Sequence, residues 1–144
     1  MSAIIGPNLF VMGGWDGYEC LDSIEKANLL DKAPSFSLLP RRHGLMDMIK
    51  NGQCIYDDEN HTILVIGGWT ERQTTDNVLV YNPHTMQCDF SGITLPKPIE
   101  GHSVVKLNNQ VFITGGFDSY GVTDSIMRLD LQTRRVFLLE TKLD

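Results

Sequence analysis

Three short runs decide the fold: Leu9-Phe10-Val11-Met12-Gly13-Gly14-Trp15, Leu64-Val65-Ile66-Gly67-Gly68-Trp69 and Phe112-Ile113-Thr114-Gly115-Gly116-Phe117. Each is a mostly apolar run that ends in a pair of glycines, which an aromatic residue follows. The three glycine pairs are separated by 54 and 48 residues. Repeats of this length indicate one supersecondary unit that is used three times.

The three copies stay in register beyond the glycines. Counted from the second glycine, position +8 is an aspartate, position +10 is Ile or Val, and position +14 is Asn or Asp. These residues are Asp22, Asp76 and Asp124; Ile24, Val78 and Ile126; and Asn28, Asn82 and Asp130. Val, Ile and Phe favour a strand, and an unbroken apolar run indicates burial on both faces. Glycine then ends the strand because it takes positive φ and admits another backbone. We expect the aspartates to hold the adjoining loops by accepting backbone N–H bonds.

The third copy predicts four short strands joined by turns, which is an antiparallel meander. Its strands are His102–Leu107, Val111–Thr114, Ser125–Leu129 and Arg135–Glu140, with a loop at Phe117–Thr123. The same pattern in the first copy predicts strands at Met1–Ile5, Leu9–Met12, Ser23–Asn28 and near Ser35–Leu39.

The second copy leaves one strand open. Its later strands are predicted at Thr62–Ile66, Asn77–Asn82 and Cys88–Ile93. We place its first strand at Gln53–Tyr56, and the alternative is Leu45–Ile49, since periodicity does not decide between them. Residues 22–32 read alone as an amphipathic helix, but the matching stretch that contains Pro83 is typical of a strand, so no helix is predicted.

Composition limits the classes of function. A chain of 144 residues fits one domain, and its net charge of −6 argues against a nucleic-acid or anionic-membrane partner. No apolar run approaches the roughly 20 residues of a membrane span, and no secretory signal is recognisable. Cys20, Cys54 and Cys88 are odd in number and widely spaced, which favours a reduced, cytoplasmic setting without zinc or disulfides.

The repeat resembles the kelch repeat over essentially the whole chain. The features that carry the resemblance are the glycine pair, the following aromatic residue and the Tyr81-Asn82-Pro83-His84-Thr85 motif. The resemblance implies an all-β fold of β-propeller blades, each a four-stranded antiparallel sheet. We expect one kelch-repeat domain over 1–144, with blades at about 1–40, 41–98 and 99–144.

The sequence departs from the kelch pattern in two places. The family tyrosine is kept at Tyr81 but replaced by Ala27 and Leu129. The family tryptophan falls at residues 34, 88 and 136, none of which is aromatic. Phe36, Phe90 and Phe137 lie close by in the fourth strands, and we expect them to supply the missing bulk between blades.

Three blades do not close a propeller, since rings have four to eight. Two readings follow from this. Either a homodimer completes a six-bladed ring, or the chain is a piece of a longer propeller.

In kelch proteins, the loops between the second and third strands and the loops between blades line the binding face. The resemblance therefore predicts partner-binding loops that mix aromatic and charged side chains. The expected residues are Trp15, Asp16, Tyr18, Arg41, Arg42, Trp69, Arg72, Asp118 and Tyr120. The adjacent Arg41 and Arg42 form a basic cluster and suit an acidic motif.

We expect neither a cofactor nor a metal site. His43, His61, His84 and His102 never pair at ligand spacing, and no nucleophile elbow or phosphate loop occurs. The resemblance implies a protein–protein interaction module, of the kind found in ubiquitin-ligase substrate adaptors and actin-associated scaffolds. The alternatives are a propeller enzyme that acts on a sugar and a fragment with no function of its own.

Overall fold

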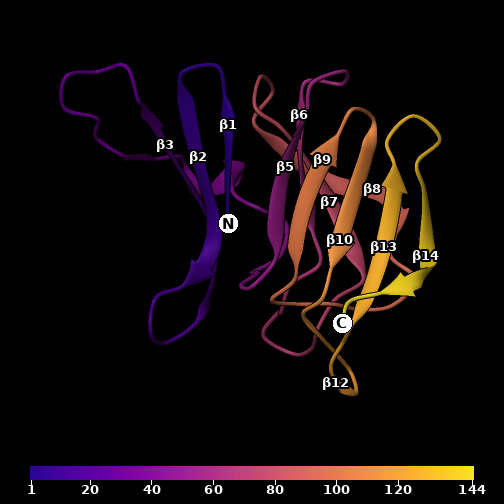
Figure 1. Cartoon of the computed structure of the whole chain (residues 1–144). Coiled ribbons are helices and arrows are strands. Elements are labelled where there is room, and N and C mark those ends of the chain that lie inside the picture. Colours follow the sequence, from indigo (N-terminus) through magenta and orange to yellow (C-terminus); the bar gives the residue numbers. More distant parts are fainter.

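Three four-stranded antiparallel sheets follow one another along the chain (Figure 1). The computed structural model describes residues 1–144, and its one helical element is the short 3-10 helix η1 (Arg41–His43). The first sheet contains β1 (Ser2–Ile5), β2 (Asn8–Trp15), β3 (Cys20–Asn28) and β4 (Ser37–Leu38). The second contains β5 (Gln53–Asp57), β6 (Thr62–Ile66), β7 (Asn77–Asn82) and β8 (Gln87–Thr94). The third contains β9 (Ser103–Leu107), β10 (Gln110–Thr114), β13 (Ser125–Asp130) and β14 (Arg135–Lys142).

The sheets stand face to face, and their first strands lie closest together. β1 approaches β5, and β5 approaches β9, while the fourth strands form the outer rim (Figure 1). Within each sheet the strands pair in chain order, so that Ile55 is opposite Leu64 and Val105 is opposite Phe112. This common register fixes which residues of the three sheets are equivalent.

Two hydrophobic cores fill the spaces between neighbouring sheets. Between the first and second sheets, Phe10, Met12 and Ile24 pack against Val65 and Tyr81, and the rings of Phe10 and Tyr81 are 6.4 Å apart. An equivalent core, which includes Ile66, Val78, Ile113 and Met127, lies between the second and third sheets. Each fully buried side chain of this size contributes about 1.5–3 kcal/mol, so the sheets are held by contact with their neighbours.

The residue at position +14 closes the turn between the third and fourth strands in every copy. Its side-chain oxygen accepts a hydrogen bond from a backbone N–H two or three residues later, as Asx turns do. The bonds run from the Leu30 amide to Asn28 (3.0 Å), from the His84 amide to Asn82 (2.9 Å) and from the Thr133 amide to Asp130 (2.8 Å). The repeated Asn or Asp is therefore explained by a repeated turn.

The glycine pairs are required by both conformation and space. Gly67 has φ +56° and Gly68 has φ +113°, which is a region that other residues rarely adopt. A Cβ atom on Gly67 would lie 2.5 Å from the carbonyl oxygen of Ile99, in the segment that crosses to the third sheet. The Gly68 amide donates to that oxygen at 2.8 Å, and the Gly14 amide donates to the Ile49 oxygen at the same distance. The first two glycine pairs thus fasten the crossing segments that lead to the next sheet.

The strand predictions are confirmed in their order and corrected in some bounds. The first strand of the second sheet is Gln53–Asp57, and the alternative at Leu45–Ile49 is wrong. Leu45 and Ile49 are buried because this crossing segment packs into the first core. Only Ser37–Leu38 of the fourth strand predicted near Ser35–Leu39 is formed.

Two loop predictions are also corrected. β2 continues through its glycines to Trp15, with a β-bulge between Met12 and Gly14, whereas β6 and β10 end at the glycines as predicted. Residues 117–123 are not a simple loop but contain the hairpin of β11 (Phe117–Asp118) and β12 (Gly121–Val122).

The prediction that three phenylalanines fill the space between sheets is wrong. Phe36, Phe90 and Phe137 are 51%, 57% and 41% exposed. In β14, Val136 packs against the second core, and Phe137 lies on the opposite face because successive strand residues alternate. In β8 it is Cys88 that packs against the first core, while Phe90, two residues further along, is exposed.

The aspartates at position +8 do not hold the loops with their carboxylates. It is the backbone carbonyl oxygens of Asp22, Asp76 and Asp124 that accept amides from the segment after the fourth strand. The side-chain acceptors beside them are the hydroxyl groups of Thr75 and Thr123, which accept the Asn77 and Ser125 amides.

Candidate functional site

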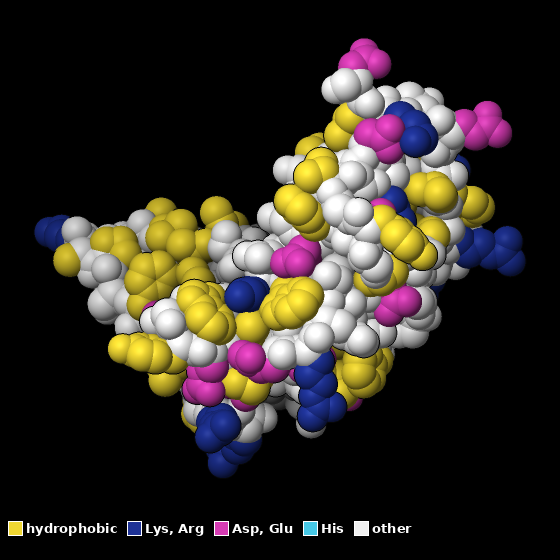
Figure 2. Space-filling model, turned by 90° about the horizontal axis from the view of Figure 1, so that it is seen from below, with side chains coloured by type: hydrophobic (Ala, Val, Ile, Leu, Met, Phe, Trp, Pro, Cys, Tyr) yellow, Lys and Arg dark blue, Asp and Glu magenta, His cyan; other side chains and the backbone are white.

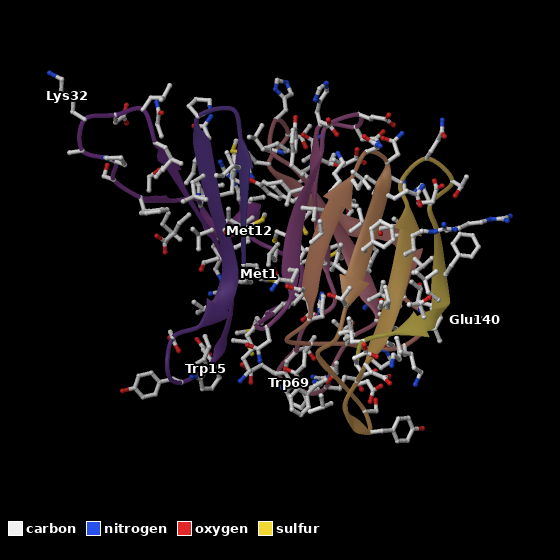
Figure 3. The ribbon with its side chains drawn as sticks, in the orientation of Figure 1. Met1, Met12, Trp15, Lys32, Trp69 and Glu140 are labelled. Atoms are coloured by element: carbon white, nitrogen blue, oxygen red, sulfur yellow. The ribbon has the colours of Figure 1, made fainter.

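The loops that join the second and third strands of all three sheets lie at one end of the molecule. We call this surface the loop face and define it as residues 15–19, 69–74 and 117–122 with the crossing residues Lys50, Asn51, Lys97 and Glu100. Trp15 and Trp69 mark this end in Figure 3, and Lys32 marks the opposite end. Residues that are 48 to 54 positions apart in the sequence thus form one surface.

A side-chain oxygen at the same position fixes each of the three loops. Asp16 Oδ1 accepts the amides of Tyr18 and Glu19 at 2.8 and 2.9 Å. Thr70 Oγ1 accepts the amides of Arg72 and Gln73 at 3.3 and 3.2 Å. The third loop uses Asp118, whose Oδ1 accepts the Tyr120 amide at 2.8 Å. The loop conformations are therefore set from within, as in Asx and ST turns.

The charges of the two loop aspartates are stabilised by these bonds. The backbone N–H groups of Glu19 and Tyr18 lower the pKa of Asp16. The Lys97 ammonium lies 2.8 Å from Asp118 Oδ2 and, together with the Tyr120 amide, lowers the pKa of Asp118. Both groups are predicted site residues, and the structure uses part of each carboxylate to shape the loop.

Backbone bridges join the crossing segments to the loops. Lys50 and Trp69 exchange two backbone hydrogen bonds of 2.9 and 2.7 Å, and Glu100 and Phe117 form the same bridge one sheet later. The Lys50 ammonium also lies 4.1 Å from the centroid of the Trp15 ring, which places a cation–π contact across the first two sheets.

Side chains tie neighbouring loops together as well. Glu71 accepts the Cys20 amide of the preceding sheet. Glu100 accepts a hydrogen bond from Asn51 at 2.9 Å and one from Thr74 at 3.3 Å. The loop face is therefore pre-organised, which reduces the entropy that a partner's binding would cost.

Large aromatic side chains stand out from this surface. Tyr18 and Tyr120, at the loop tips, are 90% and 99% exposed, and Trp15 and Phe117 are about half exposed. Figure 2, which views the molecule from this end, shows hydrophobic side chains interspersed with acidic and basic ones. Aromatic residues at the centre of a mixed surface are characteristic of protein interfaces.

A hollow of about 450 Å³ separates the loops of the second and third sheets. Its walls include Trp69, Arg72, Glu100, Phe117 and Asp118. Three of its lining residues are acidic and one is basic. The hollow is therefore suited to a basic or aliphatic side chain that approaches between two aromatic walls.

Arg41 and Arg42 do not join the loop face. They belong to η1, where Arg42 Nε donates to His43 Nε2 at 3.0 Å and His43 Nδ1 donates to the Met86 carbonyl at 3.0 Å. Met86 lies in the turn between β7 and β8, at the opposite end of the sheet from the loop face. The structure thus brings seven of the nine predicted residues to one end and places the two arginines elsewhere.

Sequence reasoning missed the crossing residues Lys50, Asn51 and Glu100. Their role arises from pairing with loops about twenty residues further along, and nothing in their own sequence marks it. The repeat register does offer one signal, because Lys50 and Glu100 precede the glycine pairs of their sheets by 17 and 15 residues.

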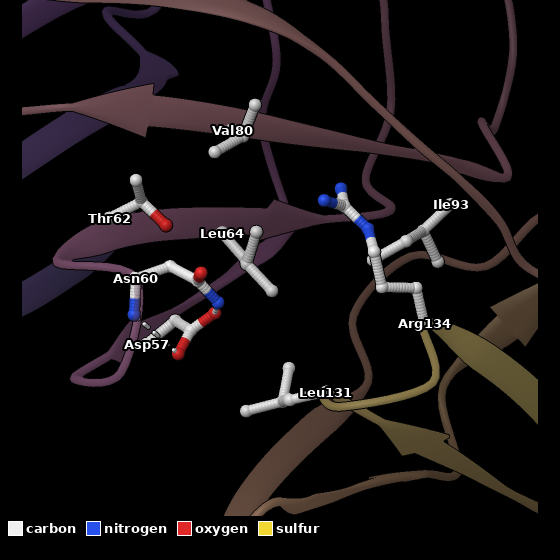
Figure 4. Close-up of a pocket in the computed structure, with 8 residues that line it drawn as sticks. All are labelled: Asp57, Asn60, Thr62, Leu64, Val80, Ile93, Leu131 and Arg134. Atoms are coloured by element: carbon white, nitrogen blue, oxygen red, sulfur yellow. Dashed lines mark hydrogen bonds between the residues drawn. The ribbon is translucent and has the colours of Figure 1, made fainter.

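A second crevice, of about 290 Å³, opens between the second and third sheets near the opposite end (Figure 4). The carboxylate of Asp57 is already engaged there, since Oδ2 accepts the Asn60 side chain at 2.7 Å and Oδ1 accepts the Glu59 amide at 3.2 Å. Arg134 donates to the Ser91 carbonyl. The polar groups of this crevice are thus used to shape turns.

No group of three His, Cys, Asp or Glu side chains in residues 1–144 is arranged to hold a metal ion. The three cysteines are unpaired, and burial raises the pKa of Cys54 to about 12. The structure contains no helix that is long and apolar enough to cross a membrane.

The fold defines three consecutive β-propeller blades whose loops build one common face. A search of solved structures supports this, since the chain superposes on the structure of YjhT with a TM-score of 0.78 at 15% identity, over 95% of this chain and 49% of that one. The Kelch motif family matches residues 99–135.

Curated relatives give the same family. The chain is 29% identical over 147 residues to Kelch domain-containing protein 10 of Homo sapiens, which covers 91% of this chain and 31% of the relative. The Xenopus tropicalis protein of the same name is 27% identical over 148 residues, with 91% and 34% covered. The chain is therefore similar to kelch-repeat proteins, and it spans about a third of the length of these relatives.

Proposed function

We propose that this chain is a protein–protein interaction module that binds its partner through the loop face. The observation that carries this proposal is the pair of almost fully exposed tyrosines, Tyr18 and Tyr120, on loops whose backbones are held by Asp16 and Asp118. Exposed aromatic side chains on rigid supports bury a large area at low entropic cost, which is the property of binding hot spots.

The charge of the surface indicates the kind of partner. The chain carries a net charge of −6, and the hollow on the loop face has more acidic than basic side chains. We expect a cytoplasmic protein segment with a Lys or Arg side chain flanked by apolar residues, and neither nucleic acid nor an anionic membrane.

Binding is favoured over catalysis because two of the three acidic side chains of the hollow have structural partners. Asp118 bonds Lys97 and the Tyr120 amide, and Glu100 bonds Asn51 and Thr74. No free carboxylate pair remains to act as general acid and base. Assays with sugar substrates are expected to show no turnover.

Substitution of the two tyrosines tests the proposal. The double variant Tyr18→Ala/Tyr120→Ala is expected to lose partner binding by about tenfold or more, since hot-spot residues contribute most of an interface's energy. Phe90→Ala removes an aromatic ring that is 57% exposed on β8, away from the loop face, and serves as the matched control. A protein that crosslinks to the wild type and to Phe90→Ala, but not to the double variant, supports binding through the loop face. Equal crosslinking to all three proteins contradicts the proposal.

Two narrower roles are proposed within this function, and each has a direct test. A substrate adaptor of a ubiquitin ligase would be recovered with a cullin complex, through residues outside those described here. An actin-associated scaffold would cosediment with actin filaments. In either case, a protein bound by the loop face is expected to be lost with Tyr18→Ala/Tyr120→Ala, whereas a protein bound elsewhere is expected to be retained.

A further inference from the structure

The third sheet exposes a face whose equivalent in the second sheet is buried. Val105 of β9 occupies the position of Ile55 in β5, since each pairs with the matching residue of the next strand. Ile55 is 8% exposed in the core between the sheets, whereas Val105 is 63% exposed. Leu95 and Leu143, which follow the fourth strands in the same way, are 3% and 44% exposed. The outward face of the third sheet is thus an interface that lacks its other half.

The first sheet shows the opposite half of the same interface. Leu131 of the third sheet is 6% exposed in the core, but its equivalent Leu29 in the first sheet is 42% exposed. Ile4 of β1, on the face turned away from the second sheet, is 56% exposed. The two ends of the array therefore carry the two complementary faces of one repeated contact.

The glycine pairs show independently that the first and third sheets each lack a neighbour on one side. A Cβ atom on Gly67 would lie 2.5 Å from the carbonyl oxygen of the next crossing segment, whereas on Gly115 it would meet no backbone atom closer than 3.8 Å. The Gly116 amide has no acceptor of the kind that Gly14 and Gly68 have in Ile49 and Ile99. At the first sheet the second glycine shows the same difference. An added Cβ atom on Gly68 would contact the carbonyl oxygen of Lys50, and one on Gly116 would contact that of Glu100, but one on Gly14 would meet nothing within 4 Å. At each end of the array, a glycine therefore lacks the backbone contact that its equivalents make between sheets.

Opposite charges distinguish these two faces from the internal ones. Arg128 of β13 stands where β7 has Val80, and Glu25 of β3 stands where β7 has Leu79. Arg128 lies 5.3 Å from the Phe137 ring, and its buried Nε has no hydrogen-bond partner. Glu25 takes part in none of the chain's three salt bridges. A cation without an acidic partner on one end face and an anion without a basic partner on the other are complementary.

We propose that the outward face of the third sheet binds the outward face of the first sheet in a second copy of this chain. Two such contacts, related by a two-fold axis, close a ring of two chains and leave no sheet face uncovered. In each contact Arg128 pairs with Glu25 of the second copy. The chain superposes on 49% of the YjhT chain, so two copies have the size of that propeller. The inference concerns the end faces and is independent of the loop face.

Light scattering coupled to size-exclusion chromatography tests the proposal on the whole chain. The wild type is expected to have twice the monomer mass of 16.2 kDa. Arg128→Glu and Glu25→Arg are each expected to weaken the dimer by about tenfold or more, because each places like charges opposite one another. The double variant Arg128→Glu/Glu25→Arg restores the opposite charges and is expected to regain the dimer. Asp89→Lys, an exposed position on β8 of the second sheet, which carries neither end face, is the matched charge-reversal control.

The outcomes separate cleanly. A dimer that the two single reversals weaken and the double reversal restores supports the two-chain ring. A monomeric wild type overturns it and indicates that further blades of a longer chain cover these faces. A dimer that is insensitive to all three charge variants, or an open series of growing oligomers, also overturns it. Circular dichroism of each variant identifies any loss of folding, and since the double reversal must rescue association, misfolding of a single variant does not count as support.

Discussion

At the scale of single residues, the glycine pairs explain most of the repeat. Gly13, Gly67 and Gly115 share φ values between 56° and 63°, and the glycine that follows each of them also has positive φ. The neighbouring crossing segment lies so close that a methyl group does not fit at Gly67. Conformation and space therefore select the same residue.

These two requirements can be measured separately. Gly6 and Gly67 have nearly the same φ, +55° and +56°, but an added Cβ atom meets nothing within 4 Å at Gly6. Gly6→Ala is expected to lower the free energy of unfolding by about 1–2 kcal/mol, the cost of left-handed backbone alone. Gly67→Ala is expected to lower it by about 1–3 kcal/mol more, as overpacking does. Urea denaturation of the two variants tests this; equal losses would contradict the close approach.

His102 makes stability depend on pH at the residue scale. It is 2% exposed, neither ring nitrogen has a hydrogen-bond partner, and burial lowers its pKa to about 4. The unfolded chain, with an ordinary histidine pKa of about 6.5, binds the proton first as the pH falls. The free energy of unfolding is therefore expected to fall between about pH 6.5 and pH 4, by up to about 3 kcal/mol from this residue.

A comparison of variants isolates this contribution. His102→Leu removes the titrating group, so its stability is expected to decline less steeply than that of the wild type over the same pH range. His84→Gln changes an exposed histidine and provides the control. Parallel pH profiles for wild type and His102→Leu would show that His102 does not carry the effect.

At the scale of elements, the loops between the second and third strands are shaped by their own side chains. Asp16, Thr70 and Asp118 occupy the same position and accept amides two residues later in all three sheets. The lengths and remaining residues of the loops differ, so the loops share an anchor while presenting different surfaces. Such an arrangement combines a fixed scaffold with variable contacts.

Hydrogen exchange measures how far the third loop depends on its anchor. Asp118→Ala removes the acceptor of the Tyr120 amide and the partner of Lys97. Exchange of the Tyr120 amide is expected to accelerate by about five- to tenfold, the equivalent of one lost hydrogen bond. Asp118→Asn keeps an oxygen acceptor and loses the charge, so a smaller acceleration is expected. Unchanged exchange in both variants would mean that the β11–β12 pairing alone holds the loop.

The sequence predicted the elements better than it predicted their faces. The order of the strands follows from the apolar runs and the glycine pairs, because each reflects local conformation. The exposure of Phe137 was not predicted, since it lies one residue beyond Val136 and a difference of one residue moves a strand side chain to the other face. The segment from Leu45 to Ile49 imitates a strand because its apolar residues are buried by packing across two sheets.

The candidate site was predicted only where the repeat register applies. The repeat register brings Trp15, Trp69 and Asp118 to equivalent loops, and the structure has them at one end of the molecule. Arg41 and Arg42 lie in a segment without an equivalent in the other copies, so the register could not place them. Their position depends on the contact of His43 with the β7–β8 turn.

At the scale of the whole molecule, the stability of each sheet depends on its packing against the adjacent sheets. No sheet contains a core of its own, and the two hydrophobic clusters lie between sheets. The outer faces of the first and third sheets are consequently the places where a further contact adds most. Their residues Glu25 and Arg128 carry opposite charges, so a contact between unlike end faces is favoured over a contact between like ones.

The connection from β3 to β4 has a consequence for how this chain tolerates change in length. Residues 29–36 are exposed throughout and cross to no other sheet, whereas residues 45–52 are clamped between two glycine pairs. Insertions and deletions accumulated over generations should therefore concentrate in the former stretch and spare the latter. The same stretch is the natural position for an epitope or a fluorescent label that leaves the packing between the three sheets of one chain undisturbed.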